Sequence, residues 1–318
     1  MTLKQKNILY ILFTSLLWGL NGNMGAYLFR TTNLSPAGLT AMRLLFGGAL
    51  LLGLTRASGQ DIFDILKTKS NLVWLALYGI FGLFVMQFAL YACIFYSNAP
   101  TACLLQYCGI FLVIFYSAVF MKVPPQKMTW IALVLTVVGV VLLLTKGDFN
   151  QLHISGITLL TGFIAMLGYT VSNIVPLQLT LRYPTKIVAG WAMVIGGLFM
   201  VLVCILRQEA LPDLGGFSLL AALYCVIFGT VVPFSLYLAS QRVVGPTIAS
   251  LLGLTESVFS TIFSIFWLKE VFSLTDLLGM TLIFIGVVLM SLPDEFWQKP
   301  RLSGKVLPAE KNPRKSTG

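Results

Sequence analysis

Long apolar runs alternate with short polar segments along the whole chain. Each run approaches or exceeds the roughly 20 residues that a helix needs to cross a hydrocarbon core about 30 Å thick. Lipid offers no partner to an unpaired backbone amide, and the runs are too long for barrel strands, so we expect helices. Ten runs fit, at residues 8–29, 36–55, 72–95, 98–121, 128–145, 155–177, 185–206, 217–240, 246–268 and 274–292.

The composition excludes a water-soluble domain. Of the 318 residues, 58% are hydrophobic and only 10% are charged, and the mean hydropathy is +0.90. A soluble fold of this length would need far more charged surface. We therefore expect the apolar surface to face the lipids of a plasma membrane, such as that of a bacterial cell.

Basic residues lie between the runs and near the C-terminus, so the net charge of +10 indicates membrane-facing loops and gives no reason to expect nucleic acid as a partner. Counted on alternate loops with the N-terminus inside, one side holds 16 of the 21 Lys and Arg residues and the other holds four. Positively charged loops tend to stay in the cytoplasm, which places both termini there. The segment 297–318 is a basic, Pro- and Ser-containing tail that we expect to be disordered.

The chain repeats itself at an offset near 147 residues, which divides it into halves at 8–145 and 155–292. The matching pairs keep their register: Leu90 and Tyr91 with Leu236 and Tyr237, Pro100 and Thr101 with Pro246 and Thr247, and Gly139 with Gly286. Each half has five runs, an odd number, so the second half must enter the membrane from the opposite side. Inverted repeats are a recurring architecture of secondary transporters, with the site between the halves near the midplane.

The segment 256–270 also carries a family resemblance. It reads Glu-Ser-Val-Phe-Ser-Thr-Ile-Phe-Ser-Ile-Phe-Trp-Leu-Lys-Glu and resembles the "EPVFA…LGE" signature of the EamA family in the drug/metabolite transporter superfamily. Glu256 and Glu270 take the two acidic positions, whereas Ser257 and Lys269 stand where the family usually has Pro and Gly. Arg43 is similar to an Arg that the family often carries early in its second helix.

This resemblance covers about residues 8–291 as two EamA repeats. It implies a ten-helix carrier of amino acids, related metabolites or drugs, often an exporter. It also implies a central cavity lined mainly by helices 1, 3, 4, 6, 8 and 9.

Arg43 and Glu256 are the clearly charged side chains that lie within the runs away from their first residues. A central charge is costly in a membrane, so each needs a partner or a wet cavity. Burial favours the protonated carboxyl of Glu256, which makes it a candidate proton carrier, whereas pairing with a cation would hold it ionised. The structural alternatives are a neutral Glu256 that bonds two helices and an Arg43 that reaches the membrane surface.

Two polar faces repeat at helical spacing on the first and sixth runs. They consist of Trp18, Asn21, Gly22 and Gly25 and of Tyr169, Ser172, Asn173 and Pro176. The inverted repeat would turn both faces towards one central space. Small and amide residues also hold membrane helices together, so helix packing is the alternative interpretation.

Three further side chains are candidates for the site. Gln87 and Gln106 can hydrogen-bond a polar solute without a buried charge, or bond a neighbouring helix instead. Trp191 lines the cavity or packs against lipid. Pro233, which aligns with Gln87, should kink its helix and free a carbonyl that the cavity could use.

Enzymatic chemistry and cofactors are not expected. His153, the only histidine, lies between the halves, and the five cysteines lie in apolar runs as buried thiols without metal-ligand spacing. We therefore predict an all-α secondary transporter of a small polar metabolite that works by alternating access and is coupled to protons through Glu256. The alternatives are a lipid or lipid-carrier flippase and a non-transporting membrane scaffold; the glycine-rich faces would permit a homodimer.

Overall fold

The computed structural model describes residues 2–120, 122, 127–146, 148, 154–209, 212–244, 249 and 252–291, and within them the chain forms ten long helical segments without a strand. This confirms the predicted all-α class. The segments are α1 (Leu3–Thr31), α2 (Pro36–Ala57), α3–η2–α4 (Lys69–Ala76, Leu77–Phe84, Val85–Tyr96), α5–α6 (Ala99–Tyr107, Gly109–Phe120), α7 (Lys127–Thr145), α8 with the short α9 (Gly156–Ile174, Leu177–Thr180), α10 (Thr185–Leu206), α11–η3–α12 (Phe217–Val226, Ile227–Val231, Val232–Val244), α14 (Thr255–Phe266) and α15 (Leu274–Ser291). A short 3-10 helix, η1 (Asp64–Lys67), precedes α3.

Three parts of the sequence prediction lie outside the described residues. These are the tail 297–318, the loop that holds His153 and most of the segment that begins the ninth run.

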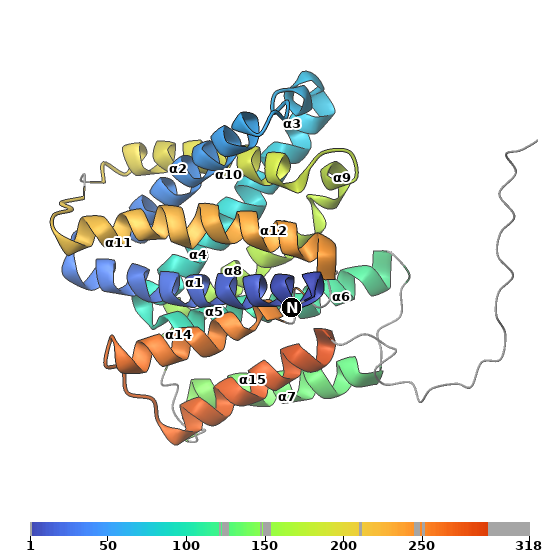
Figure 1. Ribbon diagram of the computed structural model, residues 1–318. Coiled ribbons are helices and arrows are strands. Elements are labelled where there is room, and N and C mark those ends of the chain that lie inside the picture. Colours follow the sequence, from blue (N-terminus) through green and yellow to red (C-terminus); the bar gives the residue numbers. More distant parts are fainter. Residues whose placement is uncertain are drawn as a thin grey trace, which may run out of the picture.

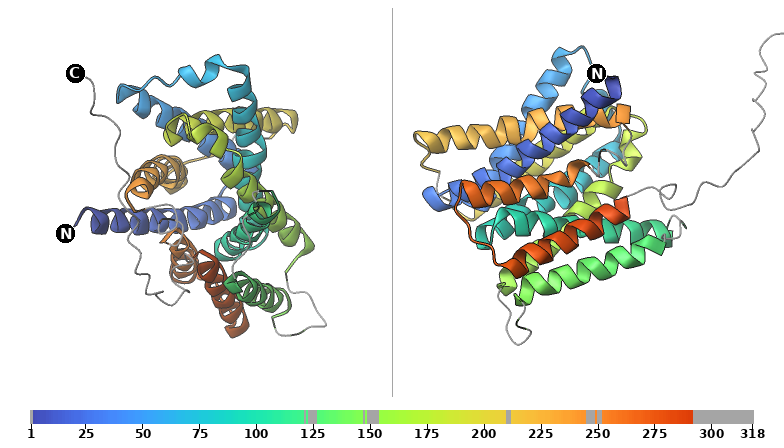
Figure 2. Two further views of the ribbon diagram at one scale, coloured as in Figure 1. Left: turned by 90° about the vertical axis from the view of Figure 1, so that its right-hand side faces the viewer. Right: turned by 60° about the horizontal axis from the view of Figure 1, so that its bottom comes forward.

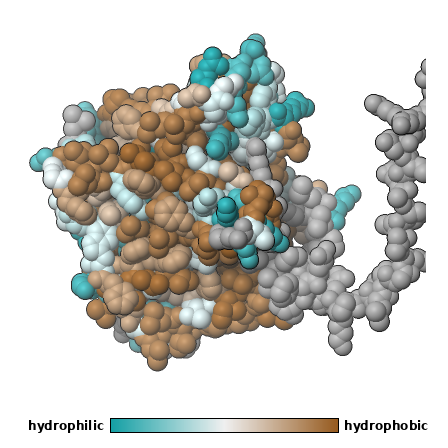
Figure 3. Space-filling view, in the orientation of Figure 1, coloured by the Kyte–Doolittle hydropathy of each residue, from teal (hydrophilic) through white to brown (hydrophobic). Residues whose placement is uncertain are grey.

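Six of the described segments are long and apolar enough to cross a membrane: 36–57, 69–96, 99–120, 156–180, 185–206 and 217–240. Helices α7 and α15 contribute shorter apolar stretches at Trp130–Leu143 and Leu274–Leu289. The surface agrees with this composition, because hydrophobic residues cover most of the face in Figure 3 and hydrophilic ones gather at its edges.

Helix α1 is the longest helix among the described residues, yet it is too polar to count among those six. The polar side chains of its middle part, Thr14, Ser15, Asn21 and Asn23, are buried within the bundle. It packs against α4, α5, α11, α12 and α14, so it runs through the middle of the fold. A polar helix in that position can supply hydrogen-bonding groups to a central site.

The helices pack with the reciprocity that two related halves require. Helix α2 pairs with its counterpart α10 and α7 pairs with its counterpart α15, and these two pairs lie at opposite edges of the bundle (Figures 1 and 2). Helix α1 contacts α11–η3–α12 and α14, while its counterpart α8 contacts η2–α4 and α5. Each half therefore uses its first helix to hold the third and fourth segments of the other half.

Two glycines show the same reciprocity at atomic scale. A Cβ on Gly139 of α7 would lie 2.6 Å from the Gly279 carbonyl oxygen of α15. A Cβ on the matching Gly286 would lie 2.8 Å from the Ala132 carbonyl oxygen of α7. The backbones approach closely at both places because neither residue has a side chain, as is common in membrane helix pairs.

The third and eighth segments each contain a π-helical stretch, η2 at Leu77–Phe84 and η3 at Ile227–Val231. The two stretches fall at corresponding positions of the two halves. π-Helical turns are rare, are often found at functional sites, and leave carbonyls that the regular i→i−4 ladder does not use. The hydropathy pattern predicted uninterrupted helices here and missed both.

Loops gather at two ends of the bundle as alternation of the ten spans requires. At one end, the Asn33 side chain accepts a hydrogen bond from the Asp213 amide at 2.9 Å. At the other end, where the N-terminus lies, Asn71 donates to the Tyr183 hydroxyl at 3.1 Å. Loops that the predicted spans place on the same side of the membrane thus meet at the same end of the bundle.

Candidate functional site

Arg43 is the most deeply buried charged side chain of the candidate site, with 3% of its surface exposed. Its guanidinium donates to Gln87 Oε1 at 2.9 Å, to Thr230 Oγ1 at 3.1 Å and to the carbonyls of Gly229 and Cys225 at 2.9 and 3.3 Å. A charge taken out of water needs such partners. The side chain is enclosed by the bundle, and it connects α2 and α4 of the first half to η3 of the second.

Pro233 explains why one of these acceptors is free. It has no amide hydrogen, so the carbonyl four residues earlier, that of Gly229, lacks its usual helical donor. Arg43 Nη2 supplies the missing hydrogen bond at 2.9 Å. The carbonyl that the sequence predicted Pro233 would free is therefore used by the buried arginine.

The Arg43 group continues towards α1 through Tyr91. The guanidinium lies over the Tyr91 ring, 5.1 Å from its centroid, a cation–π arrangement. The Tyr91 hydroxyl accepts a hydrogen bond from Asn21 Nδ2 at 3.0 Å. Arg43, Gln87, Asn21 and Tyr91 thus form one polar network, which we call the arginine network.

Glu256 lies in a second group, near mid-length of α1, where a Cβ on Gly19 would lie 2.9 Å from the Glu256 carbonyl oxygen. Its carboxylate accepts a hydrogen bond from the Tyr107 hydroxyl at 2.6 Å and a longer one from the Cys103 thiol at 3.7 Å. Glu256 lies in the first turn of α14 in the second half, whereas both donors lie on α5 in the first. We call these three residues the glutamate group.

Two aromatic clusters lie in the bundle, and one of them includes Tyr107 of the glutamate group. Tyr107 packs edge-on against Tyr169 of α8, with ring centroids 5.6 Å apart. Trp18 of α1 packs on Tyr237 and Phe234 of α12 at 5.4 and 5.6 Å. Tyr169 and Trp18, predicted from matching faces of the two halves, therefore both lie in aromatic clusters within the bundle.

Several polar atoms of this region have no hydrogen-bond partner among the described residues. They are Asn21 Oδ1 on α1, Gln106 Oε1 on α5 and Ser172 Oγ on α8. A buried acceptor without a donor costs free energy, so unpaired acceptors mark places where water or a polar solute is stabilised.

Two predicted candidates hydrogen-bond backbone carbonyls that belong to neither group. Asn173 is exposed and donates to the Tyr169 carbonyl of its own helix at 2.7 Å. The Trp191 indole donates to the Ile62 carbonyl at 2.7 Å, which ties α10 to the loop after α2. We therefore leave Trp191 out of the candidate site.

Arg43 and Glu256 bond different partners, and no ion pair joins them within the described residues. Sequence reasoning did not predict Tyr91 of the arginine network, Tyr107 and Cys103 of the glutamate group, or Thr230, which accepts a hydrogen bond from Arg43. In the sequence, Tyr91 stands out only as a repeat match and Cys103 only as a packing thiol. Their apolar surroundings hid them, because a hydroxyl or thiol scarcely changes local hydropathy.

Two cavities lie towards opposite ends of the bundle. The larger, about 340 Å³, includes Thr101, which lies on α5 two residues before Cys103. The smaller, about 270 Å³, includes Ser235 and Leu238, which flank Tyr237 on α12. The described residues contain no group of three His, Cys, Asp or Glu side chains that could hold a metal ion.

Comparison with known proteins agrees with this architecture. The model of the EamA-like transporter family matches the chain twice, over residues 5–145 and 156–292. The uncharacterized inner membrane transporter YicL of Salmonella typhimurium is 31% identical over 288 residues, which covers 91% of this chain and 96% of that protein. Protein PecM of Dickeya dadantii is 27% identical over 188 residues, 56% of this chain and 60% of the relative.

A solved crystal structure shares the fold with a TM-score of 0.63 and 19% identity, covering 90% of this chain and 96% of that one. The chain belongs to the EamA-like transporter family. It is a multi-pass membrane transporter of a small-molecule substrate and not an enzyme.

Proposed function

We propose that this transporter is a secondary carrier that moves a small polar metabolite, such as an amino acid or an amine, by alternating access. In this proposal the solute occupies the space between the arginine network and the glutamate group. The unpaired acceptors Asn21 Oδ1 and Gln106 Oε1 suit a solute that brings hydrogen-bond donors.

The observation that carries the proposal is the contact of Glu256 with Tyr107 and Cys103 across the two halves. If one half rocks against the other, this contact must change, so the carboxyl of Glu256 meets different partners in the two orientations. A titratable group whose surroundings depend on orientation couples proton binding to transport. Glu256 is therefore the proposed coupling residue, with its proton exchanged at alternate faces.

The test uses the purified full chain in proteoliposomes that contain the pH-sensitive dye pyranine. The proteinogenic amino acids and a set of primary amines are added in turn, and proton movement driven by each solute is recorded. Glu256→Gln should abolish solute-driven proton movement, whereas Asp64→Asn, which alters an exposed ion pair with Lys67, should not. Full activity of Glu256→Gln would refute the coupling role.

A further inference from the structure

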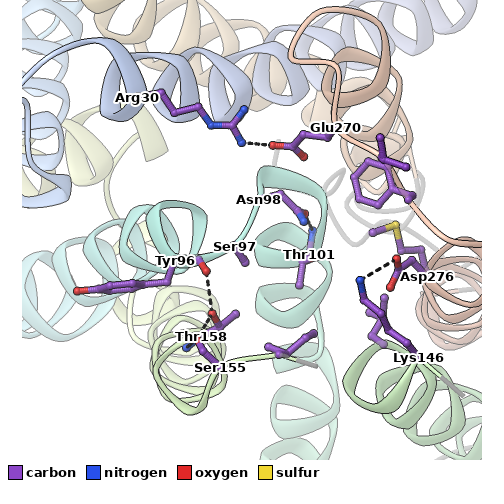
Figure 4. A pocket seen from close by; sticks show the side chains of 15 residues that line it. Arg30, Tyr96, Ser97, Asn98, Thr101, Lys146, Ser155, Thr158, Glu270 and Asp276 are labelled. Carbon is purple, nitrogen blue, oxygen red and sulfur yellow. Dashed lines mark hydrogen bonds and ion pairs between the residues drawn. The ribbon is translucent and has the colours of Figure 1, made fainter. Parts of the chain in front are cut away.

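The larger cavity lies away from the glutamate group, at the bundle end opposite the N-terminus, and we call it the ion-pair vestibule. Its volume is about 340 Å³, and its polar lining includes Arg30, Asn98, Thr101, Lys146, Glu270 and Asp276. Figure 4 shows these side chains around one space, contributed by the ends of helices from both halves. A small metabolite fits a cavity of this size.

Two ion pairs in the vestibule join the halves. Arg30, near the end of α1, bonds Glu270 in the loop between α14 and α15. Lys146, directly after α7, lies 3.5 Å from Asp276 in the first turn of α15. Both pairs are drawn in Figure 4, and each takes its cation from the first half and its carboxylate from the second.

The cations and the carboxylates differ in burial. The side chains of Arg30 and Lys146 are 48% and 43% exposed, whereas those of Glu270 and Asp276 are 12% and 8% exposed. An exposed ion pair contributes little free energy, so Arg30 and Lys146 lose little when they leave their carboxylates and become solvated. The buried carboxylates are fixed in place and need a positive partner. A cation from solution can therefore replace Arg30 or Lys146 at these carboxylates.

The two carboxylates are not equivalent. Asp276 Oδ2 also accepts hydrogen bonds from the Ser273 amide and hydroxyl, at 2.9 and 2.7 Å, and so caps the start of α15. Glu270 Oε2 is buried and has no hydrogen-bond partner among the described residues. A carboxylate oxygen in that state is an acceptor for a further charged donor, and an ammonium group has three donors in a compact head.

We propose that the ion-pair vestibule binds solutes that carry a primary ammonium group, with Glu270 accepting the ammonium in place of Arg30. The proposal rests on the proposed function and names its substrate class, since it makes the vestibule the place where an amine or amino acid enters or leaves. Arg30 then acts as a competitor for Glu270 when the vestibule is empty. For an amino acid, the released guanidinium is free to pair with the carboxylate of the solute.

Equilibrium binding to the purified full chain in nanodiscs tests this without transport. The probes are n-butylamine, 2-aminobutyrate, butyrate and 1-butanol, each titrated in a calorimeter at pH 7. The first two should bind and the last two should not. Glu270→Gln should weaken n-butylamine binding by about tenfold or more, because it removes a charge-assisted hydrogen bond, and Asp64→Asn serves as the matched control.

The decisive variant is Arg30→Gln, which removes the competitor and should strengthen n-butylamine binding several-fold. A purely structural role for the Arg30 pair predicts the opposite sign, so this result also decides the question if Glu270→Gln fails to fold. Weaker binding to Arg30→Gln, or equal binding of butyrate and n-butylamine, would overturn the proposal. Loss of binding in Glu256→Gln but not in Glu270→Gln would overturn it too, and would place the amine in the glutamate group while leaving the carrier function intact.

Discussion

The close contact between η2 and α10 predicts that an alanine at Gly79 lowers the stability of the protein. A Cβ on Gly79 would lie 2.5 Å from the Ala192 carbonyl oxygen and 3.3 Å from the Gly196 amide nitrogen. A Cβ on Gly196 would in turn lie 2.5 Å from the Gly79 carbonyl oxygen. Backbone meets backbone on both sides, so no flexible side chain can move aside. Gly79→Ala must therefore push the two segments apart.

The magnitude follows from two opposed effects. Overpacking of a tight interface costs about 1–3 kcal/mol, and replacing a helical Gly by Ala returns about 0.5–1 kcal/mol. We expect a net loss of about 1–2 kcal/mol, equivalent to a Tm roughly 1.5–3 °C lower for a chain of this length. Gly53 of α2 is the matched control, because a Cβ there meets no atom within 4 Å. Gly53→Ala should leave the Tm unchanged or raise it.

Thermal unfolding of both variants in one detergent, followed by circular dichroism, measures the difference. Gly79→Ala should unfold at a lower temperature than the parent protein, and Gly53→Ala at the same or a higher one. Equal shifts of the unfolding temperature in the same direction for both variants would contradict the close backbone contact between η2 and α10.

Three further variants test separate features. Arg43→Gln should lower the free energy of unfolding by about 2–4 kcal/mol, because it leaves buried carbonyls unpaired; a smaller loss in urea titrations would show that they find other donors. Lys269 has a φ of 55°, so Lys269→Gly should stabilise the turn after α14 by roughly 1 kcal/mol, and an unchanged Tm would argue against strain there. Trp191→Phe loses the bond to Ile62 and should cost about 1 kcal/mol without changing the KM of transport; a raised KM would return Trp191 to the site.

The sequence was sufficient for the architecture because lipid imposes simple rules. A segment that spans a membrane must be helical, long and apolar, so hydropathy alone locates it. The duplication followed from residues such as Gly139 and Gly286, whose matched positions reflect a matched need for close approach. Lys269 has a left-handed backbone conformation, which glycine adopts most easily, and this accounts for the Gly that the family signature usually has at that position.

The candidate site was only partly predictable. Arg43 and Glu256 stood out because charge is rare in a span, and Pro233 indicated a free carbonyl. Their partners did not stand out, since Tyr107 and Thr230 look like ordinary residues of an apolar helix. The π-helical stretches were also missed, because they follow from tertiary contacts between helices and leave no mark in a hydropathy pattern.

The opposite orientation of the two halves is the central claim, and side-specific thiol labelling tests it most directly. Arg30 lies near the end of α1, the first segment of the first half. Arg182 lies just after α9, which ends the first segment of the second half. Both residues are exposed. Arg30→Cys and Arg182→Cys, each in a variant without the native cysteines, are treated in intact cells and in inverted vesicles with a membrane-impermeant maleimide. The account predicts that position 30 reacts only from outside the cell and position 182 only from inside. Labelling of both positions from the same side would contradict it.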